Sequence, residues 1–246
     1  MNNNLVLMFH DVISRDFPNS GFSKPGALQY TIDDHKFEEL VKFCVESSSD
    51  VVFSFDDGGN SFYNIAAPIL ERYGKRGVFF ISTGFIDSDR FLTRSQIREL
   101  HERGHVIASH SNSHPRDISK LPYDKIVEEW SSSKNILEGI IGDSVTVASI
   151  PGGAVSSNVL RALSECGYHD VYTSEPTAGL KRVDGMNVIG RYTITNHSDI
   201  PYLKKLLYDS SYRRKLIIKY RTLRFIKSIL GSNYNKIKQA FLALKK

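Results

Sequence analysis

The chain has 246 residues, 41% hydrophobic and 24% charged, values that are ordinary for a soluble globular protein. No stretch approaches the roughly 20 apolar residues of a membrane-spanning helix, and the start MNNNLVLMFHDV lacks the basic segment of a secretory signal. The two cysteines, Cys44 and Cys166, form no CxxC motif and are typical of buried thiols in a reducing compartment. These features predict a cytoplasmic protein.

The apolar and β-branched runs alternate with longer segments of helical periodicity. Strands are predicted at residues 5–9, 51–55, 77–82, 105–109, 145–150, 170–174 and 186–192, and helices at residues 33–46, 62–73, 93–102, 122–141 and 155–166. Thr93 and Gln96 have the spacing of a capping box, and Gly104 marks the end of that helix. The alternation predicts an α/β fold with about seven parallel strands joined by crossover helices.

Polar and titratable residues follow these strands at the point where each one ends. They are His10-Asp11, Asp56-Asp57-Gly58-Gly59, the segment HSNSHP from His110, Pro151-Gly152-Gly153, Glu175 and Arg191. In parallel α/β folds the carboxyl ends of the strands meet on one side of the sheet, where active sites form. The sequence therefore predicts a functional site on that rim.

His110 and His114 are four residues apart, a spacing that places two imidazoles on one face of a helical turn. With one carboxylate they would form a three-ligand metal site that keeps a position open, as catalytic sites do. Two surface histidines in a polar loop are the alternative interpretation of this spacing.

Asp56 and Asp57 are adjacent at the end of a strand, where consecutive side chains point in opposite directions. They can therefore divide the work, one binding a metal ion and the other accepting a proton from the attacking water. Gly58 and Gly59 allow the chain to turn without filling the pocket. A simple turn with a capping aspartate is the alternative.

The motifs SFDDG and HSNSHP, in this order, resemble those of the polysaccharide deacetylase family, the NodB-homology domain among the carbohydrate esterases. The resemblance extends from Leu5 to about Asp199 and includes LMFHDV, RGVFFISTGFI and IPGGAVSSNVLRALSECGYHDVYTSEP. It implies a distorted barrel of about seven β/α units that removes an N-acyl group, usually acetyl, from an amino sugar.

The resemblance also implies a role for each motif residue. Asp56 would be the general base, and Asp57, His110 and His114 would bind a divalent metal ion, with Zn²⁺ the foremost candidate. The backbone N–H of Gly152 would help to hold the oxyanion.

The chain departs from the family pattern at four features. The usual aromatic residue after the proline is Gly152, and the DxxDW motif is missing, with Glu175 near its place. The other two departures concern the catalytic residues. The arginine that orients the base, two residues before the proline of the third motif, is replaced here by Ser149. We expect Arg191, on the last predicted strand, to substitute for it. The general-acid histidine has no clear match; His197 and His10 are the candidates, and His10 would act as an acid or a substrate-binding residue.

The carboxyl-terminal part of the chain is strongly basic. Residues 203–246 contain 13 Lys or Arg and one acidic residue, a net charge of +12, which leaves −7 on the other 202 residues. We therefore divide the chain into a barrel, residues 1–200, and a basic helical extension, residues 201–246. Its helical segment, residues 213–230, would pack on the barrel, lie on an anionic membrane surface or bind nucleic acid; no nucleic-acid motif supports the last.

These observations predict a metal-dependent hydrolase that deacetylates a nucleotide- or lipid-linked amino sugar in surface-polysaccharide or glycan biosynthesis. The expected location is the cytoplasm, peripherally on the inner face of the membrane. Two alternatives stay open. One is a glycosidase that uses Asp56 with another carboxylate. The other is a barrel with impaired catalysis that binds glycan or membrane.

Overall fold

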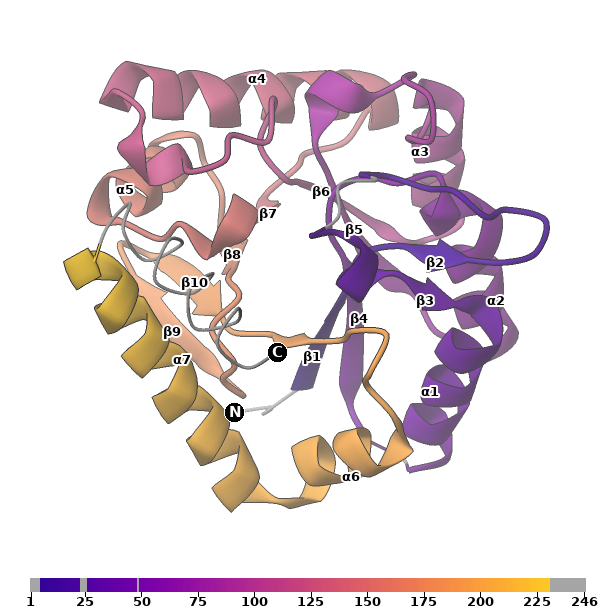
Figure 1. Ribbon diagram of the computed structural model, residues 1–246. Coiled ribbons are helices and arrows are strands. Elements are labelled where there is room, and N and C mark those ends of the chain that lie inside the picture. Colours follow the sequence, from indigo (N-terminus) through magenta and orange to yellow (C-terminus); the bar gives the residue numbers. More distant parts are fainter. Residues whose placement is uncertain (1–4, 23–25, 48, 231–246) are drawn as a thin grey trace.

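The computed structural model describes residues 5–22, 26–47 and 49–230, so the end of the basic extension lies outside the described residues. Its main sheet has nine strands in the order β11-β1-β4-β5-β6-β7-β8-β10-β9, curved into an open barrel (Figure 1). Every neighbouring pair is parallel except β10 and β9. In the order of the sheet the strands are Tyr192–Thr193, Leu5–Phe9, Val51–Phe55, Gly77–Ile81, Val106–Ser109, Val147–Ser149, Asp170–Tyr172, Met186–Ile189 and Leu180–Val183.

The predicted α/β barrel is confirmed, but the strand count of about seven was too low. The edge strand β9 was missed because its residues are mostly exposed and polar, without an apolar pattern. The segment predicted as one strand at residues 186–192 is divided between β10 and β11. A separate two-stranded sheet, β2 (Val12–Ile13) with β3 (Ile32–Asp33), was also missed, since two-residue strands give no periodic signal.

The crossover helices lie outside the sheet and cover it. They are α1 (Asp34–Glu46), α2 (Ala67–Arg72), α3 (Arg94–Glu102), α4 (Tyr123–Ile141) and α5 (Ser157–Glu165), with a π-helical turn, η2 (Phe62–Ala66), before α2. The capping box of Thr93 and Gln96 is present at the start of α3. Each helix buries one apolar stripe, and these residues join the buried strand residues in one large core; a smaller second cluster is formed by Val78, Phe80 and Ala108.

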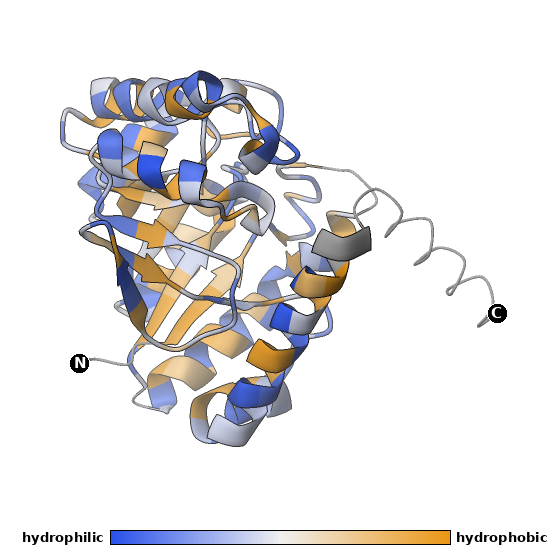
Figure 2. Cartoon of the chain, turned by 90° about the vertical axis from the view of Figure 1, so that its left-hand side faces the viewer, coloured by the Kyte–Doolittle hydropathy of each residue, from blue (hydrophilic) through white to orange (hydrophobic). Residues whose placement is uncertain are grey.

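Aromatic rings fill the core between the first strands and the helices that cover them. Phe55 lies 5.2 Å from both Phe9 and Phe79, measured between ring centroids, and Phe62 stacks on Phe79 at 5.1 Å. Figure 2 shows this apolar interior as a band of hydrophobic strands. Burying each of these side chains stabilises the folded state by about 1.5–3 kcal/mol, and their packing keeps the ends of the strands in place relative to one another.

The gap between the two ends of the sheet is crossed by two residues, Gly190 and Arg191. They link β10, which pairs with β8, to β11, which pairs with β1. A Cβ atom at Gly190 would collide with the Thr177 side chain and the Glu175 carbonyl, so only glycine allows this close passage. The crossing places Arg191 inside the barrel.

Two helices follow the last strand, α6 (Ile200–Tyr208) and α7 (Ser210–Leu230). Leu203 and Leu206 of α6 are fully buried in the main core. The guanidinium of Arg213 donates to the Leu206 and Leu207 carbonyls at 2.6 and 3.1 Å, which ties α7 to the end of α6. Among the described helices, none combines the length and the apolar character that crossing a membrane requires.

Candidate active site

Strands β1 and β4 fix the first two residues of the site. Their parallel register pairs Phe9 with Phe55, so His10 and Asp56 follow side by side at the strand ends. The Asp56 N–H donates to the Phe9 carbonyl at 3.0 Å and continues the ladder by one residue. The base candidate is therefore held by the sheet itself.

The chain turns sharply directly after Asp56. Asp57 has a φ of +86° and Gly58 a φ of +94°, both in the left-handed region. A non-glycine residue in this region costs of the order of 1–3 kcal/mol. The turn directs the adjacent carboxylates to different partners, as the predicted division of labour requires.

His110 and His114 are brought together by a bent loop after β6, and the helical turn expected from their spacing is not formed. Ser111 and His114 have φ values of +63° and +52°, and these two left-handed residues fold the loop back on itself. Glu129 of α4 holds the loop: it accepts the N–H groups of Asn112 and Ser113 at 3.0 and 2.8 Å. Glu129 was not predicted, because nothing in the local sequence links α4 to this loop.

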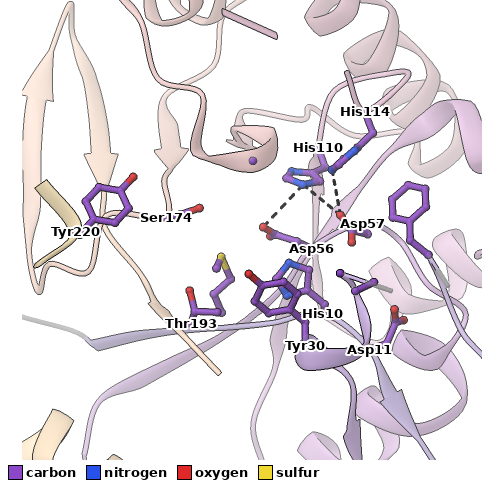
Figure 3. Close-up of a pocket in the computed structure, with 15 residues that line it drawn as sticks. His10, Asp11, Tyr30, Asp56, Asp57, His110, His114, Ser174, Thr193 and Tyr220 are labelled. Atoms are coloured by element: carbon purple, nitrogen blue, oxygen red, sulfur yellow. Dashed lines mark ion pairs between the residues drawn. The ribbon is translucent and has the colours of Figure 1, made fainter. Parts of the chain in front are cut away.

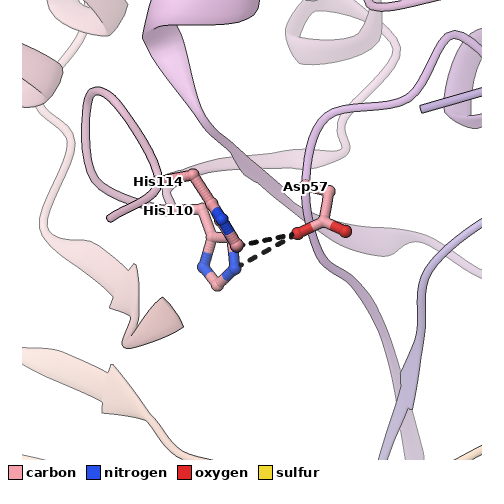
Figure 4. A group of neighbouring side chains, drawn as sticks. All are labelled: Asp57, His110 and His114. Carbon is pink, nitrogen blue, oxygen red and sulfur yellow. Dashed lines mark ion pairs between the residues drawn. The ribbon is translucent and has the colours of Figure 1, made fainter. Parts of the chain in front are cut away.

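Asp57, His110 and His114 form a group that could hold a metal ion. Asp57 Oδ1 lies 3.5 Å from His110 Nε2 and 3.3 Å from His114 Nε2, and the three donor atoms lie within 4.8 Å of one another (Figure 4). Two imidazole nitrogens and a carboxylate oxygen are a donor set typical of catalytic zinc.

A carbonyl behind His110 supports this fit. His110 Nδ1 is 2.9 Å from the Ser149 carbonyl, which can accept only an N–H and therefore leaves Nε2 unprotonated in the neutral ring. Metal-binding histidines are commonly oriented in this way. The residues present thus fit a divalent ion.

Asp56 forms a buried ion pair with Arg191. The guanidinium donates to both carboxylate oxygens, Nη1 to Oδ1 at 2.6 Å and Nη2 to Oδ2 at 2.8 Å. Arg191 is fully buried between the rings of Phe80 and Tyr172, whose centroids lie 5.1 and 5.9 Å from Cζ. Burial is the largest single influence and raises the pKa of Asp56, but the charge and hydrogen bonds of Arg191 together with the charges of His110 and His10 outweigh it, so the pKa lies below its ordinary value.

Ser149 shows how the departure from the family pattern is accommodated. Its hydroxyl accepts from Arg191 Nη2 at 2.7 Å and lies 3.4 Å from Asp56 Oδ2. The guanidinium of Arg191 reaches Asp56 from the segment between β10 and β11, beside the Ser149 hydroxyl. The structure therefore places an arginine on Asp56, as expected, by a different route through the chain.

A cavity of about 530 Å³ opens in front of these residues (Figure 3). Its volume is within the usual range for small-molecule sites, about 300–1,000 Å³. The residues that line it are Met8, His10, Asp11, Phe22, Gly26, Ala27, Tyr30, Asp56, Asp57, His110, His114, Gly152, Ser174, Thr193 and Tyr220.

Of the two candidates for the general acid, His10 lines this cavity and His197 does not. His10 lines it and stacks on Tyr30, with 4.6 Å between ring centroids, and burial lowers its pKa. His197 is exposed and does not line the cavity. Of the predicted site residues, Arg191 alone lies behind the cavity wall, while His10, Asp56, Asp57, His110, His114 and Gly152 line it.

Two histidines and a carboxylate at the carboxyl ends of parallel strands are typical of metal-dependent hydrolases with a barrel fold.

A family model described as polysaccharide deacetylase matches residues 45–171, more than half of the chain, and the chain belongs to this family. It is 29% identical over 149 residues to the protein YxkH of Bacillus subtilis, covering 61% of this chain and 53% of that protein. It is 28% identical over 127 residues to the Bacillus subtilis peptidoglycan-N-acetylmuramic acid deacetylase PdaA, covering 50% of this chain and 46% of PdaA.

Solved structures share the fold. The Streptococcus pyogenes deacetylase PplD, in complex with acetate, superposes with a TM-score of 0.70 at 19% identity over 83% of this chain and 97% of that one. A de-N-acetylase from Aggregatibacter actinomycetemcomitans gives 0.67 at 19% identity, over 83% and 99%. The chain spans about half the length of the curated relatives it matches.

Proposed function

We propose that the protein is a metal-dependent N-deacetylase that acts on an amino sugar in a nucleotide- or lipid-linked precursor of a surface polysaccharide or glycan. The observation that carries the proposal is the buried pair of Asp56 and Arg191 beside the Asp57, His110 and His114 group. This arrangement separates a carboxylate held for proton transfer from a carboxylate available to a metal ion. Family membership supports a carbohydrate deacetylase as the broader class.

Asp57, His110 and His114 would hold a divalent ion, with Zn²⁺ the foremost candidate, and that ion would supply Lewis acidity at the amide carbonyl. Asp56 accepts the proton of the attacking water, and Arg191 holds its carboxylate in one orientation. The Gly152 N–H, at the edge of the cavity, helps to hold the negative charge that develops on the carbonyl oxygen.

His10 is the proposed proton donor to the leaving amine. It lies on the cavity floor below Asp56 (Figure 3), and its pKa is lowered mainly by burial. A lowered pKa leaves a smaller fraction of the ring protonated but makes that form a stronger acid. The neighbouring charges of Asp57 and Asp56 oppose the effect of burial and favour the protonated ring.

A barrel with impaired catalysis was an alternative on two grounds, because Ser149 replaces the orienting arginine and because the general-acid histidine has no clear match. The two hydrogen bonds from Arg191 to Asp56 speak against the first ground, and the proposed role of His10 answers the second. A glycosidase would leave the proximity of His110 and His114 to Asp57 without a use.

We also propose that the protein works at the cytoplasmic face of a membrane, bound peripherally through α7. Arg214 and Lys215 are exposed on this helix, and Ile218 and Phe225 are 59% and 66% exposed. Basic and apolar residues on one helix surface are suited to anionic lipid. Flotation with anionic and neutral vesicles tests this: binding to anionic vesicles that is lost at high salt is expected, and no binding at low salt would contradict it.

The activity itself is tested by acetate release from a panel of nucleotide-linked, lipid-linked and oligomeric N-acetyl amino sugars. The metal-free protein should be inactive and should regain activity with Zn²⁺. The Asp56→Asn variant, with zinc content matched to the parent, is the control for acetate that does not come from this site. The rate across the panel identifies the preferred carrier of the sugar.

A further inference from the structure

Helix α7 reaches the cavity with one of its side chains. Tyr220 lines the cavity together with Ser174, which follows β8, and Thr193 of β11. In Figure 3 these three residues lie on the side facing the group of Asp57, His110 and His114. The basic extension therefore supplies part of the wall opposite the metal-binding group.

Two polar contacts hold this part of α7 against the segments that follow the neighbouring strands β7 and β8. Arg221 Nε donates to Glu175 Oε1 at 2.8 Å, which links the helix to the segment after β8. Arg224 Nη2 donates to the Val155 carbonyl at 3.2 Å, which links it to the segment after Gly153. Tyr220 is one residue before the first of these anchors, so they restrict its position along the helix.

The phenol lies against the loop that carries the proposed oxyanion N–H. A Cβ atom at Gly153 would be 3.5 Å from Tyr220 Oη and 3.3 Å from Ser174 Oγ. Burial raises the pKa of Tyr220, which keeps its hydroxyl protonated and able to donate at neutral pH. Tyr220 thus presents an apolar ring and a polar tip at the cavity edge, a combination suited to a sugar ring.

We propose that Tyr220 is a substrate-binding residue and that Tyr220, Ser174 and Thr193 form a subsite for the part of the substrate that extends away from the reacting acyl group. The subsite accepts a hydroxylated sugar or the glycosidic linkage next to it. This inference rests on the proposed deacetylase function and adds to it the use of the extension in substrate recognition.

The test compares Tyr220→Ala and Tyr220→Phe with Tyr208→Ala, a control at a tyrosine of α6 that is 65% exposed. With the best substrate of the acetate-release panel, Tyr220→Ala should raise KM about tenfold and change kcat little, since ring contact and hydrogen bond are lost away from the reacting atoms. Tyr220→Phe should raise KM about threefold. Zinc content and the thermal unfolding midpoint of each variant show whether the site and the fold are intact.

A second arm measures binding without turnover, by calorimetric titration of tri-N-acetylchitotriose into zinc-loaded proteins that all carry Asp56→Asn to suppress turnover. Tyr220→Ala should weaken binding about tenfold relative to both the parent and Tyr208→Ala. If the parent releases no acetate, the proposed function is wrong, but the calorimetric titration still shows whether Tyr220 contributes to sugar binding. Unchanged KM or unchanged binding in Tyr220→Ala would overturn the subsite.

Discussion

The two walls of the cavity are built in different ways. The wall that holds Asp56, Asp57, His110 and His114 comes from the ends of two sheet strands, β4 and β6, and lies within residues 45–171, the part matched by the family model. The facing wall holds Ser174, Thr193 and Tyr220, all beyond residue 171, from three separate elements.

We infer from this difference that the first wall carries out the reaction and that the facing wall binds the rest of the substrate. The metal-binding wall is rigid because its residues continue buried strands and are fixed by hydrogen bonds to Phe9, Ile81 and Ser149. The facing wall depends on a helix packed late in the chain and anchored by Arg221 and Arg224. Substitutions on the first wall should therefore abolish turnover, whereas substitutions on the second should change which substrates bind.

The largest effect is expected from removing both histidines of the metal-binding wall. The double variant His110→Ala, His114→Ala should lose the bound metal and essentially all activity, since only Asp57 remains of the three donors. Metal analysis and circular dichroism check this, with His169→Ala as a control at an exposed histidine. Undiminished metal content in the double variant would show that the ion binds elsewhere.

The next largest effect is expected at the base. Asp56→Asn should retain metal but lose about 10²–10⁴-fold in kcat, because the substitution removes proton transfer and leaves the donor group in place. Asp57→Asn should lose metal as well. Equal metal loss in both variants would mean that the two aspartates do not divide the work.

Arg191 lies behind the cavity wall and pairs with Asp56, so its removal should affect stability and activity together. Arg191→Ser leaves the Asp56 carboxylate buried without its partner, which should cost about 3–5 kcal/mol in the free energy of unfolding. A misplaced base should lower kcat about a hundredfold. Urea unfolding and acetate release measure the two effects.

A double variant sharpens this prediction. Ser149→Arg combined with Arg191→Ser returns the arginine to the position that the family pattern gives it, and it should recover much of the lost stability and turnover. If Arg191→Ser alone turns over like the parent, the pair has no part in positioning the base.

The smallest effect is expected on the outer surface of α7. Arg214→Glu with Lys215→Glu should weaken binding to anionic vesicles several-fold or more per residue, since each basic residue near a membrane contributes about 1 kcal/mol. Acetate release from a soluble substrate should not change. The control is Lys120→Glu with Lys125→Glu, which reverses two exposed charges outside α7. Equal loss of binding in both would indicate a response to net charge alone.

The strands of the main sheet up to β8 could be predicted, because each is a compact run with apolar residues bounded by polar residues or glycines. The break between β10 and β11 could not, because MNVIGRY is continuous as a β pattern. The sheet bends there to bring its two edges together, and the collision that selects Gly190 involves Thr177 and Glu175, which pack against it only in the folded barrel.

The site divides in the same way. Asp57, His110 and His114 could be recognised because they belong to two short sequence motifs, SFDDG and HSNSHP. The conformation of the loop that joins the two histidines could not, because it depends on hydrogen bonds to Glu129 of α4. Arg191 could be suggested from its place at a strand end. Tyr220 could not, because its approach to the cavity depends on the long-range anchors Arg221–Glu175 and Arg224–Val155.

The most direct test of the account is acetate release by the zinc-loaded parent and by zinc-loaded Asp56→Asn, measured side by side on the preferred N-acetyl amino sugar. The account predicts one acetate for each amine formed by the parent, with a rate at least about a hundredfold lower for the variant at equal zinc content. Equal rates for the two proteins, or no acetate from the parent with any member of the panel, would contradict it.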